Sequence, residues 1–142
     1  MSAKVRVFFD TNILIYQFDQ TAPGKQKRAK ELLEKHILDE RAVISSQVVQ
    51  EFINVSTKKF STKLTIQELQ SIMSDMLEPL CAHTPTFEFY ERALKLSAQN
   101  SLGFYDTLII QAAMDLRCNI LYSEDLQDNQ RFGTLVVRNP FV

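Results

Sequence analysis

Residues 4–18 read KVRVFFDTNILIYQF, and this stretch sets the architecture that we expect for the whole chain. Residues 4–9 end on three consecutive apolar side chains, which is typical of a central parallel strand covered on both faces. The strand stops at the Asp-Thr-Asn of residues 10–12, residue types that cap helices well. A short apolar helix over residues 13–18 should follow. The chain is therefore expected to open with a buried strand that runs directly into a helix, with a carboxylate at the junction.

The rest of the chain alternates between helical and strand patterns of apolar residues. Pro23-Gly24 is expected to form a turn, and Pro79 to end the helix before it. This alternation predicts an α/β fold, a parallel sheet with helices on both faces, formed by one domain over residues 1–142. We expect helices over residues 25–38, 46–56, 65–78, 86–99 and 104–116, and strands at 42–44, 80–82, 119–122 and 135–137, with a polar loop reaching Gly133.

Composition excludes several classes of function. The chain has only three glycines and lacks the glycine-rich loops that cradle nucleotide phosphates. No segment approaches the ~20 apolar residues of a membrane span, and residues 1–20 do not resemble a secretory signal. The two cysteines, Cys81 and Cys118, are expected to be buried and reduced, which suits the cytoplasm. The net charge of −1 argues against a purely electrostatic nucleic-acid binder but not against a nuclease.

Two acids follow strands of the predicted sheet, where ligands of open α/β sheets bind. Asp10 comes directly after the first strand, and Asp125 follows the strand at 119–122 within three residues. Each has a simpler explanation when it is taken alone. Asp10 could only cap the next helix, and Asp125 could only lie in a turn.

Two further acids stand on predicted helices beside apolar positions. Asp106 opens the helix at 104–116 and heads a stripe of apolar residues, where a carboxylate is costly unless it is paired or bound. It could instead act as a cap favoured by the helix dipole. Glu51 flanks the apolar stripe of the preceding helix, although it could be a partly exposed surface glutamate.

The joint pattern of these acids points to a metal. Four converging carboxylates would repel one another and stay partly protonated unless a cation neutralised them. Magnesium or manganese suits a site made only of oxygen ligands. Zinc suits it poorly, because His36 and His83 are far apart in sequence and are expected to be surface or capping residues.

The motifs taken together resemble a known family. Phe-Phe-Asp-Thr-Asn-Ile-Leu at 8–14, Gln-Glu-Phe at 50–52, Tyr-Asp-Thr-Leu-Ile at 105–109 and Tyr-Ser-Glu-Asp-Leu-Gln at 122–127 look like a PIN domain. The likeness covers nearly the whole chain and is strongest to the compact bacterial kind, the VapC-type toxins of toxin–antitoxin pairs. The resemblance implies a three-layer α/β/α sandwich, a homodimer, a small antitoxin partner and magnesium- or manganese-dependent cleavage of single-stranded RNA.

The resemblance also assigns roles to residues. Motif matching makes Asp10, Glu51, Asp106 and Asp125 the acidic metal ligands, with Asn12 and Ser123 as polar supports. Glu124 and Asp128 are close rivals of Asp125, which the family's pattern of small hydroxyl, any residue and Asp favours.

Metal-assisted hydrolysis would use a water as the nucleophile and a carboxylate as its proton acceptor. The expected products carry 5′-phosphate and 3′-hydroxyl ends, since no RNA 2′-hydroxyl is needed. RNA could be held by basic clusters, although charge runs more often form a solvated helix face. These clusters are Lys25, Lys27, Arg28 and Lys30, and then Lys58, Lys59 and Lys63 beside Phe60.

Two other classes of protein compete with a nuclease. One is a catalytically inactive PIN-like module that binds RNA or protein, against which the complete set of acids counts. The other is a phosphotransfer domain. Phosphatases of that type need an Asp-x-Asp motif, but residues 10–12 are Asp-Thr-Asn. Receiver domains need an acceptor aspartate at the end of a middle strand, but the predicted strand at 42–44 is followed by two serines.

Overall fold

A computed structural model of the protein describes residues 4–58 and 64–142. Among these residues six strands form one sheet in the order β3-β2-β1-β4-β6-β5, and all neighbouring pairs are parallel except β5 with β6. The expected α/β class with a central, mostly parallel sheet is confirmed. The strands are β1 (Arg6–Phe9), β2 (Ala42–Ser45), β3 (Cys81–His83), β4 (Cys118–Tyr122), β5 (Arg131–Phe132) and β6 (Leu135–Arg138).

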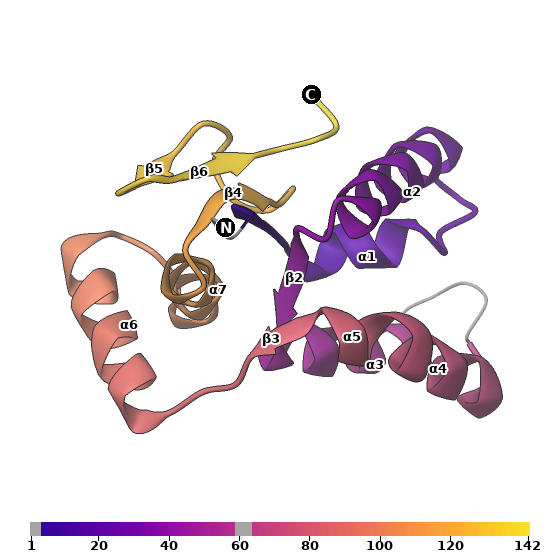
Figure 1. The fold of residues 1–142 in the computed structure, drawn as a ribbon, viewed down its shortest axis with the longest axis horizontal. Coiled ribbons are helices and arrows are strands. Elements are labelled where there is room, and N and C mark those ends of the chain that lie inside the picture. Colours follow the sequence, from indigo (N-terminus) through magenta and orange to yellow (C-terminus); the bar gives the residue numbers. More distant parts are fainter. Residues whose placement is uncertain (1–3, 59–63) are drawn as a thin grey trace.

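Helices cover the sheet from both sides. In Figure 1, α6 and α7 lie to the left, α1 to α5 lie to the right, and strands β1 and β2 run between them. This arrangement is the three-layer sandwich expected from the sequence. The helices are α1 (Thr11–Tyr16), α2 (Pro23–Leu38), α3 (Ser46–Lys58), α4 (Ile66–Ile72), the π-helical turn η1 (Met73–Leu77), α5 (Glu78–Leu80), α6 (Phe87–Gln99) and α7 (Phe104–Asp115).

The centre of the molecule is strand β1, which pairs with β2 on one side and β4 on the other. Its last three residues are buried, as the apolar run predicted. Phe9 lies opposite Tyr122, and the backbone N–H of Asp10 donates to the Tyr122 carbonyl at 2.9 Å. The parallel register therefore brings the residues after β1, β2 and β4 to the same edge of the sheet.

Helix starts follow their side-chain caps. Thr65 and Glu68 form a reciprocal capping box at the start of α4, and the Thr86 hydroxyl accepts the N–H of Phe89 in α6. Helix α1 begins at Thr11, two residues earlier than predicted, because Asp10 alone serves as the cap. Within the described residues, none of the helices has the length and apolarity to cross a membrane.

Two prolines behave differently from the prediction. Pro23 does not form a turn with Gly24 but starts α2, where its missing N–H would have no helical partner in any case. Pro79 does not stop the helix before it. The helix passes through the wider turn η1, in which the Glu78 N–H donates to the Met73 carbonyl, and this shift in hydrogen-bond register accommodates the ring.

Three further expectations were wrong. The segment before Gly133, expected to be a loop, contains strand β5, which is too short to show a periodic pattern. Gly133 then reverses the direction of the chain with a φ of 61°. His36 is buried rather than exposed and packs against the rings of Phe9 and Tyr122, with centroid distances of 5.8 Å to each. Burial lowers its pKa. Cys118 is buried as expected, but Cys81 is only half-buried, and both are free thiols.

Candidate active site

Asp10 is the most buried acid of the predicted set. It ends β1 and is only 7% exposed. The N–H of Thr11 donates to one carboxylate oxygen at 2.8 Å, and the Ser123 hydroxyl donates to the other at 2.7 Å. The pKa of Asp10 is raised to about 6, chiefly by burial and to a smaller extent by the charges of Glu51 and Asp125, against the lowering effect of these two hydrogen bonds. Asp10 is thus both a helix cap and an acid held in one orientation.

Asp125 is joined to the same place through two polar side chains. The Asn12 amide donates to Asp125 Oδ2 at 2.9 Å and accepts the N–H of Glu124 at 3.3 Å. The buried Ser123 hydroxyl accepts the N–H of Asp125 at 3.2 Å while donating to Asp10. Asn12 and Ser123 therefore connect the turn after β4 to the start of α1, and they orient the two aspartates relative to each other.

Glu51 reaches this edge of the sheet from α3. Its side chain is exposed at the flank of the apolar stripe, and the Thr11 hydroxyl donates to Oε1 at 3.2 Å. Partial burial raises the pKa of Glu51, hydrogen bonds from Thr11 and Gln47 lower it, and the charges of Asp106 and Asp125 add to the rise. In the sequence, Thr11 is recognised only as part of a capping group. In the structure its hydroxyl also links Glu51 to the end of β1.

Asp106 lies in the first turn of α7, but the expectation that it faces the core was wrong. Its side chain is exposed, and the next residue, Thr107, is the buried one, with its hydroxyl bonded to the Gly103 carbonyl at 2.9 Å. Nor does Asp106 cap the helix, because the cap position is Gly103. Desolvation and the charge of Asp125 raise the pKa of Asp106. The helix dipole favours an acid in this first turn, but Asp106 makes no capping hydrogen bond that would explain it further.

The four predicted acids interact electrostatically although they come from four separate segments. Asp10 is affected by Glu51 and Asp125, Glu51 by Asp106 and Asp125, and Asp106 by Asp125. Among the described residues, no lysine or arginine lies within ion-pair distance of Asp10, Glu51, Asp106 or Asp125. The fold therefore places carboxylates near one another without a protein cation to neutralise them.

The donor chemistry of this set fits a hard divalent cation, because every candidate ligand is a carboxylate oxygen. The arrangement is nevertheless open. Within residues 4–58 and 64–142, no three acidic, histidine or cysteine side chains stand close enough together to enclose an ion. Asp10 is held by two hydrogen bonds, while the side chains of Glu51, Asp106 and Asp125 are exposed.

The two rivals of Asp125 are engaged elsewhere. Glu124 forms an ion pair with Lys25 at 2.5 Å and accepts the Tyr16 hydroxyl at 2.6 Å. Burial alone would raise the pKa of Glu124, but these two partners bring it below its usual value. Asp128 accepts the backbone N–H of Asn139 at 2.9 Å. Both acids stabilise the C-terminal part of the chain.

The predicted basic clusters have different outcomes. Lys25 is paired with Glu124, and the Arg28 guanidinium donates to the Pro140 carbonyl at 3.2 Å, so half of the first cluster has protein partners. Lys27 and Lys30 are exposed on α2. In the second cluster Lys58 is exposed at the end of α3, while Lys59, Phe60 and Lys63 lie outside the described residues.

The family model of the PIN domain matches residues 7–130. The chain belongs to the PIN-domain family. Members of this family are generally nucleases, and they typically use divalent metal ions.

One solved structure supports the fold of this PIN domain. It is the crystal structure of FitAcB from Neisseria gonorrhoeae, which superposes with a TM-score of 0.64 at 15% sequence identity. The match covers 95% of this chain and 98% of the other. Among curated protein sequences, none matches the chain.

Proposed function

We propose that this PIN domain is a metal-dependent endoribonuclease that hydrolyses phosphodiester bonds in single-stranded or loop RNA. The observation that carries the proposal is the set of neighbouring carboxylates from β1, α3, α7 and the turn after β4. Three of them have raised pKa values, and among the described residues no lysine or arginine forms an ion pair with any of the four. Perturbed acids of this kind concentrate at functional sites, and a divalent cation is the counterion that they lack.

Asp10, Glu51, Asp106 and Asp125 would hold one or two magnesium or manganese ions, with Asn12 and Ser123 positioning two of these acids. A bound ion would supply Lewis acidity at the phosphoryl oxygen, lower the pKa of a coordinated water and stabilise the leaving oxygen.

The side chains have distinct parts in the reaction that we propose. Asp10 provides a fixed point, because two hydrogen bonds define its carboxylate orientation. Exposed Glu51 and Asp106 have raised pKa values that suit them to accept the proton of the attacking water. The water oxygen bonds to phosphorus, the bond from phosphorus to the 3′ oxygen breaks, and the products carry 5′-phosphate and 3′-hydroxyl ends.

We further propose that the protein is the toxin of a toxin–antitoxin pair. The support is the resemblance to compact VapC-type toxins and membership of the PIN-domain family. This role implies a small antitoxin protein as partner, a homodimer as the working form and action in the cytoplasm. The free thiols of Cys81 and Cys118 agree with a reducing compartment.

The test is cleavage of mixed single-stranded RNA by the purified protein with magnesium, with manganese and with EDTA. Asp106→Asn is the test variant, and Asp115→Asn, on the same helix but paired with Arg92, is the matched control. We expect metal-dependent cleavage that falls by at least about 100-fold in Asp106→Asn and stays within twofold in Asp115→Asn.

Two results would contradict parts of this proposal. Cleavage that leaves a 2′,3′-cyclic phosphate would exclude the hydrolytic mechanism. Magnesium binding without any cleavage of RNA, by protein free of bound partners, would favour the alternative of a catalytically inactive PIN-like binding module.

A further inference from the structure

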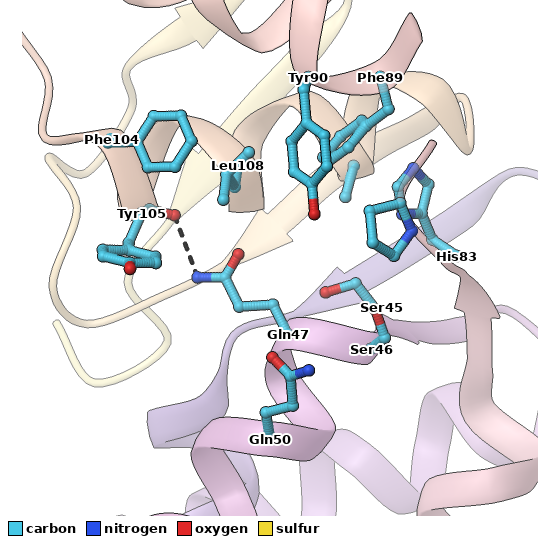
Figure 2. Close-up of a pocket in the computed structure, with 12 residues that line it drawn as sticks. Ser45, Ser46, Gln47, Gln50, His83, Phe89, Tyr90, Phe104, Tyr105 and Leu108 are labelled. Carbon is cyan, nitrogen blue, oxygen red and sulfur yellow. Dashed lines mark hydrogen bonds between the residues drawn. The ribbon is translucent and has the colours of Figure 1, made fainter. Parts of the chain in front are cut away.

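A pocket of about 430 Å³ lies beside the acids, between the end of β2, the starts of α3 and α7, and helix α6. Its size falls within the range of small-molecule sites, roughly 300–1,000 Å³. Figure 2 shows Phe104 and Tyr105 on one side and His83 on the other, with the Tyr90 hydroxyl pointing into the space between them. Gln47 and Gln50 project from α3 on the opposite side from Tyr90.

The walls of this pocket offer aromatic faces that the protein itself does not cover. Tyr105 is 71% exposed, and Phe104 and Tyr90 are also exposed, although large aromatic side chains are normally buried. The rings of Phe104 and Tyr105 stand edge to face with their centroids 5.5 Å apart. Bases of single-stranded nucleic acids stack on aromatic side chains of this kind.

The floor of the pocket contains an unpaired polar atom. The Ser45 side chain is only 3% exposed and lines the pocket, and its hydroxyl has no hydrogen-bond partner among the residues that the structure describes. A buried hydroxyl without a partner is unfavourable, so its presence needs an explanation. A ligand with polar edge groups would provide the missing partner, and the amides of Gln47 and Gln50 lie on the same side of the pocket.

The charge of the pocket selects among ligands. Among residues 4–58 and 64–142, no lysine or arginine lines it, so this lining is not suited to hold a phosphate. His83, which lines the pocket and could supply a positive charge, lies 3.5 Å from the Asp115 carboxylate. An uncharged, flat group with hydrogen-bonding edges matches this lining best, and a nucleobase is such a group.

The pocket and the acids share two helices. The Gln47 amide donates to the Tyr105 carbonyl at 3.2 Å and thereby joins the first turns of α3 and α7. Tyr105 and Gln50 line the pocket, and the residues that follow them directly are the acids Asp106 and Glu51. A nucleotide whose base enters the pocket would therefore have its phosphate close to the carboxylates.

We propose that this pocket receives one unpaired base of the RNA next to the cleaved phosphate and so determines base preference at the cut. The proposal rests on the nuclease function proposed above and identifies a specificity site for it. Tyr105, Phe104 and Tyr90 provide stacking surfaces, and Ser45 with the two glutamines reads the edge of the base.

The test uses Tyr105→Leu and Ser45→Ala, with Phe87→Leu as the control. Phe87 is also on the surface, 84% exposed on α6, but does not line the pocket. A random-sequence RNA pool is cleaved in the presence of manganese, and the products give the base frequencies beside the cut. The cleavage rates give KM and kcat for each protein. Binding of a fluorescein-labelled random-sequence RNA is measured with calcium replacing manganese. Gel filtration gives the oligomeric state of each protein.

We expect the wild type to prefer certain bases at one position beside the cut. Both pocket variants should lose this preference and raise KM by about fivefold or more with kcat retained, as expected when ground-state binding of a base is removed. Phe87→Leu should match the wild type. Ser45→Ala should melt at or above the wild-type temperature, because it removes an unpaired buried hydroxyl, and so loss of preference cannot reflect unfolding.

The other outcomes separate this proposal from the nuclease function. Cleavage with unchanged KM and base preference in both variants would overturn the pocket and leave the nuclease intact. Absence of cleavage, with RNA binding weakened at least fivefold by the pocket variants alone, would support the pocket and reject the nuclease. Loss of dimers in Tyr105→Leu with unchanged RNA affinity would show that the pocket belongs to a protein interface, and would also overturn the proposal.

Discussion

Helix α7 carries one aspartate in its first turn and another at its last residue, and their surroundings are opposite. The helix dipole favours the charge of Asp106 at the N-terminus and disfavours that of Asp115 at the C-terminus. The pKa directions are nevertheless reversed. Desolvation and Asp125 raise the pKa of Asp106. Burial would raise the pKa of Asp115, but hydrogen bonds from Arg92 and Gln111 bring it below its usual value.

The difference shows that neighbours, rather than position on the helix, decide how each carboxylate behaves. The Arg92 guanidinium donates to both carboxylate oxygens of Asp115, at 2.6 and 3.1 Å, and so links α6 to α7. The same contrast occurs between adjacent residues after β4, where Glu124 pairs with Lys25 while Asp125 joins the other acids. Among the described residues, the acids that hold elements together have ion-pair partners, whereas those at the carboxyl edge of the sheet have none.

The largest effect on this contrast should come from Asp10→Asn. Raising the pKa of Asp10 from 3.8 to about 6 corresponds to roughly 3 kcal/mol of unfavourable free energy at neutral pH. Because the folded-state pKa is the higher one, the folded state binds more protons between these values. Its contribution to stability is complete below about pH 4 and is lost as the pH rises through about 6.

We therefore expect Asp10→Asn to be more stable than the wild type at pH 7 in EDTA, by about 1–3 kcal/mol. The advantage should vanish near pH 4. Urea denaturation at several pH values would measure it. If the free energy of unfolding depends on pH equally in the variant and the wild type, the pKa of Asp10 is not raised in the folded state.

Magnesium should have the next largest effect, because it would neutralise the unpaired acids. At a concentration of 100 times its Kd, a ligand that binds only the folded state adds about 2.7 kcal/mol. The melting temperature of the wild type and of Asp115→Asn should rise by several degrees when EDTA is replaced by magnesium. In Asp106→Asn the rise should be mostly lost. An equal rise in both variants would remove Asp106 from the set of metal ligands.

A smaller effect, of opposite sign, is expected at the paired end of α7. In EDTA, Asp115→Asn should lower the melting temperature by about 2–4 °C, since it breaks the bidentate but partly exposed ion pair with Arg92. Asp106→Asn should leave the temperature equal or slightly higher, because the loss of desolvation cost and of repulsion from Asp125 offsets the small favourable effect of the helix dipole. If both variants melt lower by the same amount, the two ends of the helix do not differ as proposed.

The smallest effect is expected from Glu124→Gln, which weakens the pair with half-exposed Lys25. The melting temperature should change by less than about 2 °C, and the change should shrink in high salt. RNA cleavage should remain at the wild-type rate. A clear loss of cleavage would place Glu124, rather than its neighbour Asp125, among the residues of the active site.

Sequence patterns alone predicted most of the elements. The apolar run at 7–9, the amphipathic stripes and the Asp-Thr-Asn junction led to the correct order of strands and helices up to β4. Errors arose where the decisive interaction is too short or too unusual to produce a period. The two-residue strand β5 and the π-helical turn before Pro79 are the clearest cases. His36 was misjudged because nothing in its local sequence shows that two distant aromatic rings enclose it.

What the sequence by itself determined is the α/β architecture and the choice of four candidate acids, because periodicity and motif order are local properties of the chain. The tertiary structure decided which acids are free. In the sequence, only a motif match favours Asp125 over Glu124 and Asp128. In the folded protein their partners differ, since Glu124 pairs with Lys25, Asp125 accepts from Asn12 and Asp128 accepts the N–H of Asn139. Hydrogen bonds and charge pairing depend on distances between segments that are far apart in the chain. The same reason explains why the aromatic pocket beside Ser45 could be found only in the folded protein.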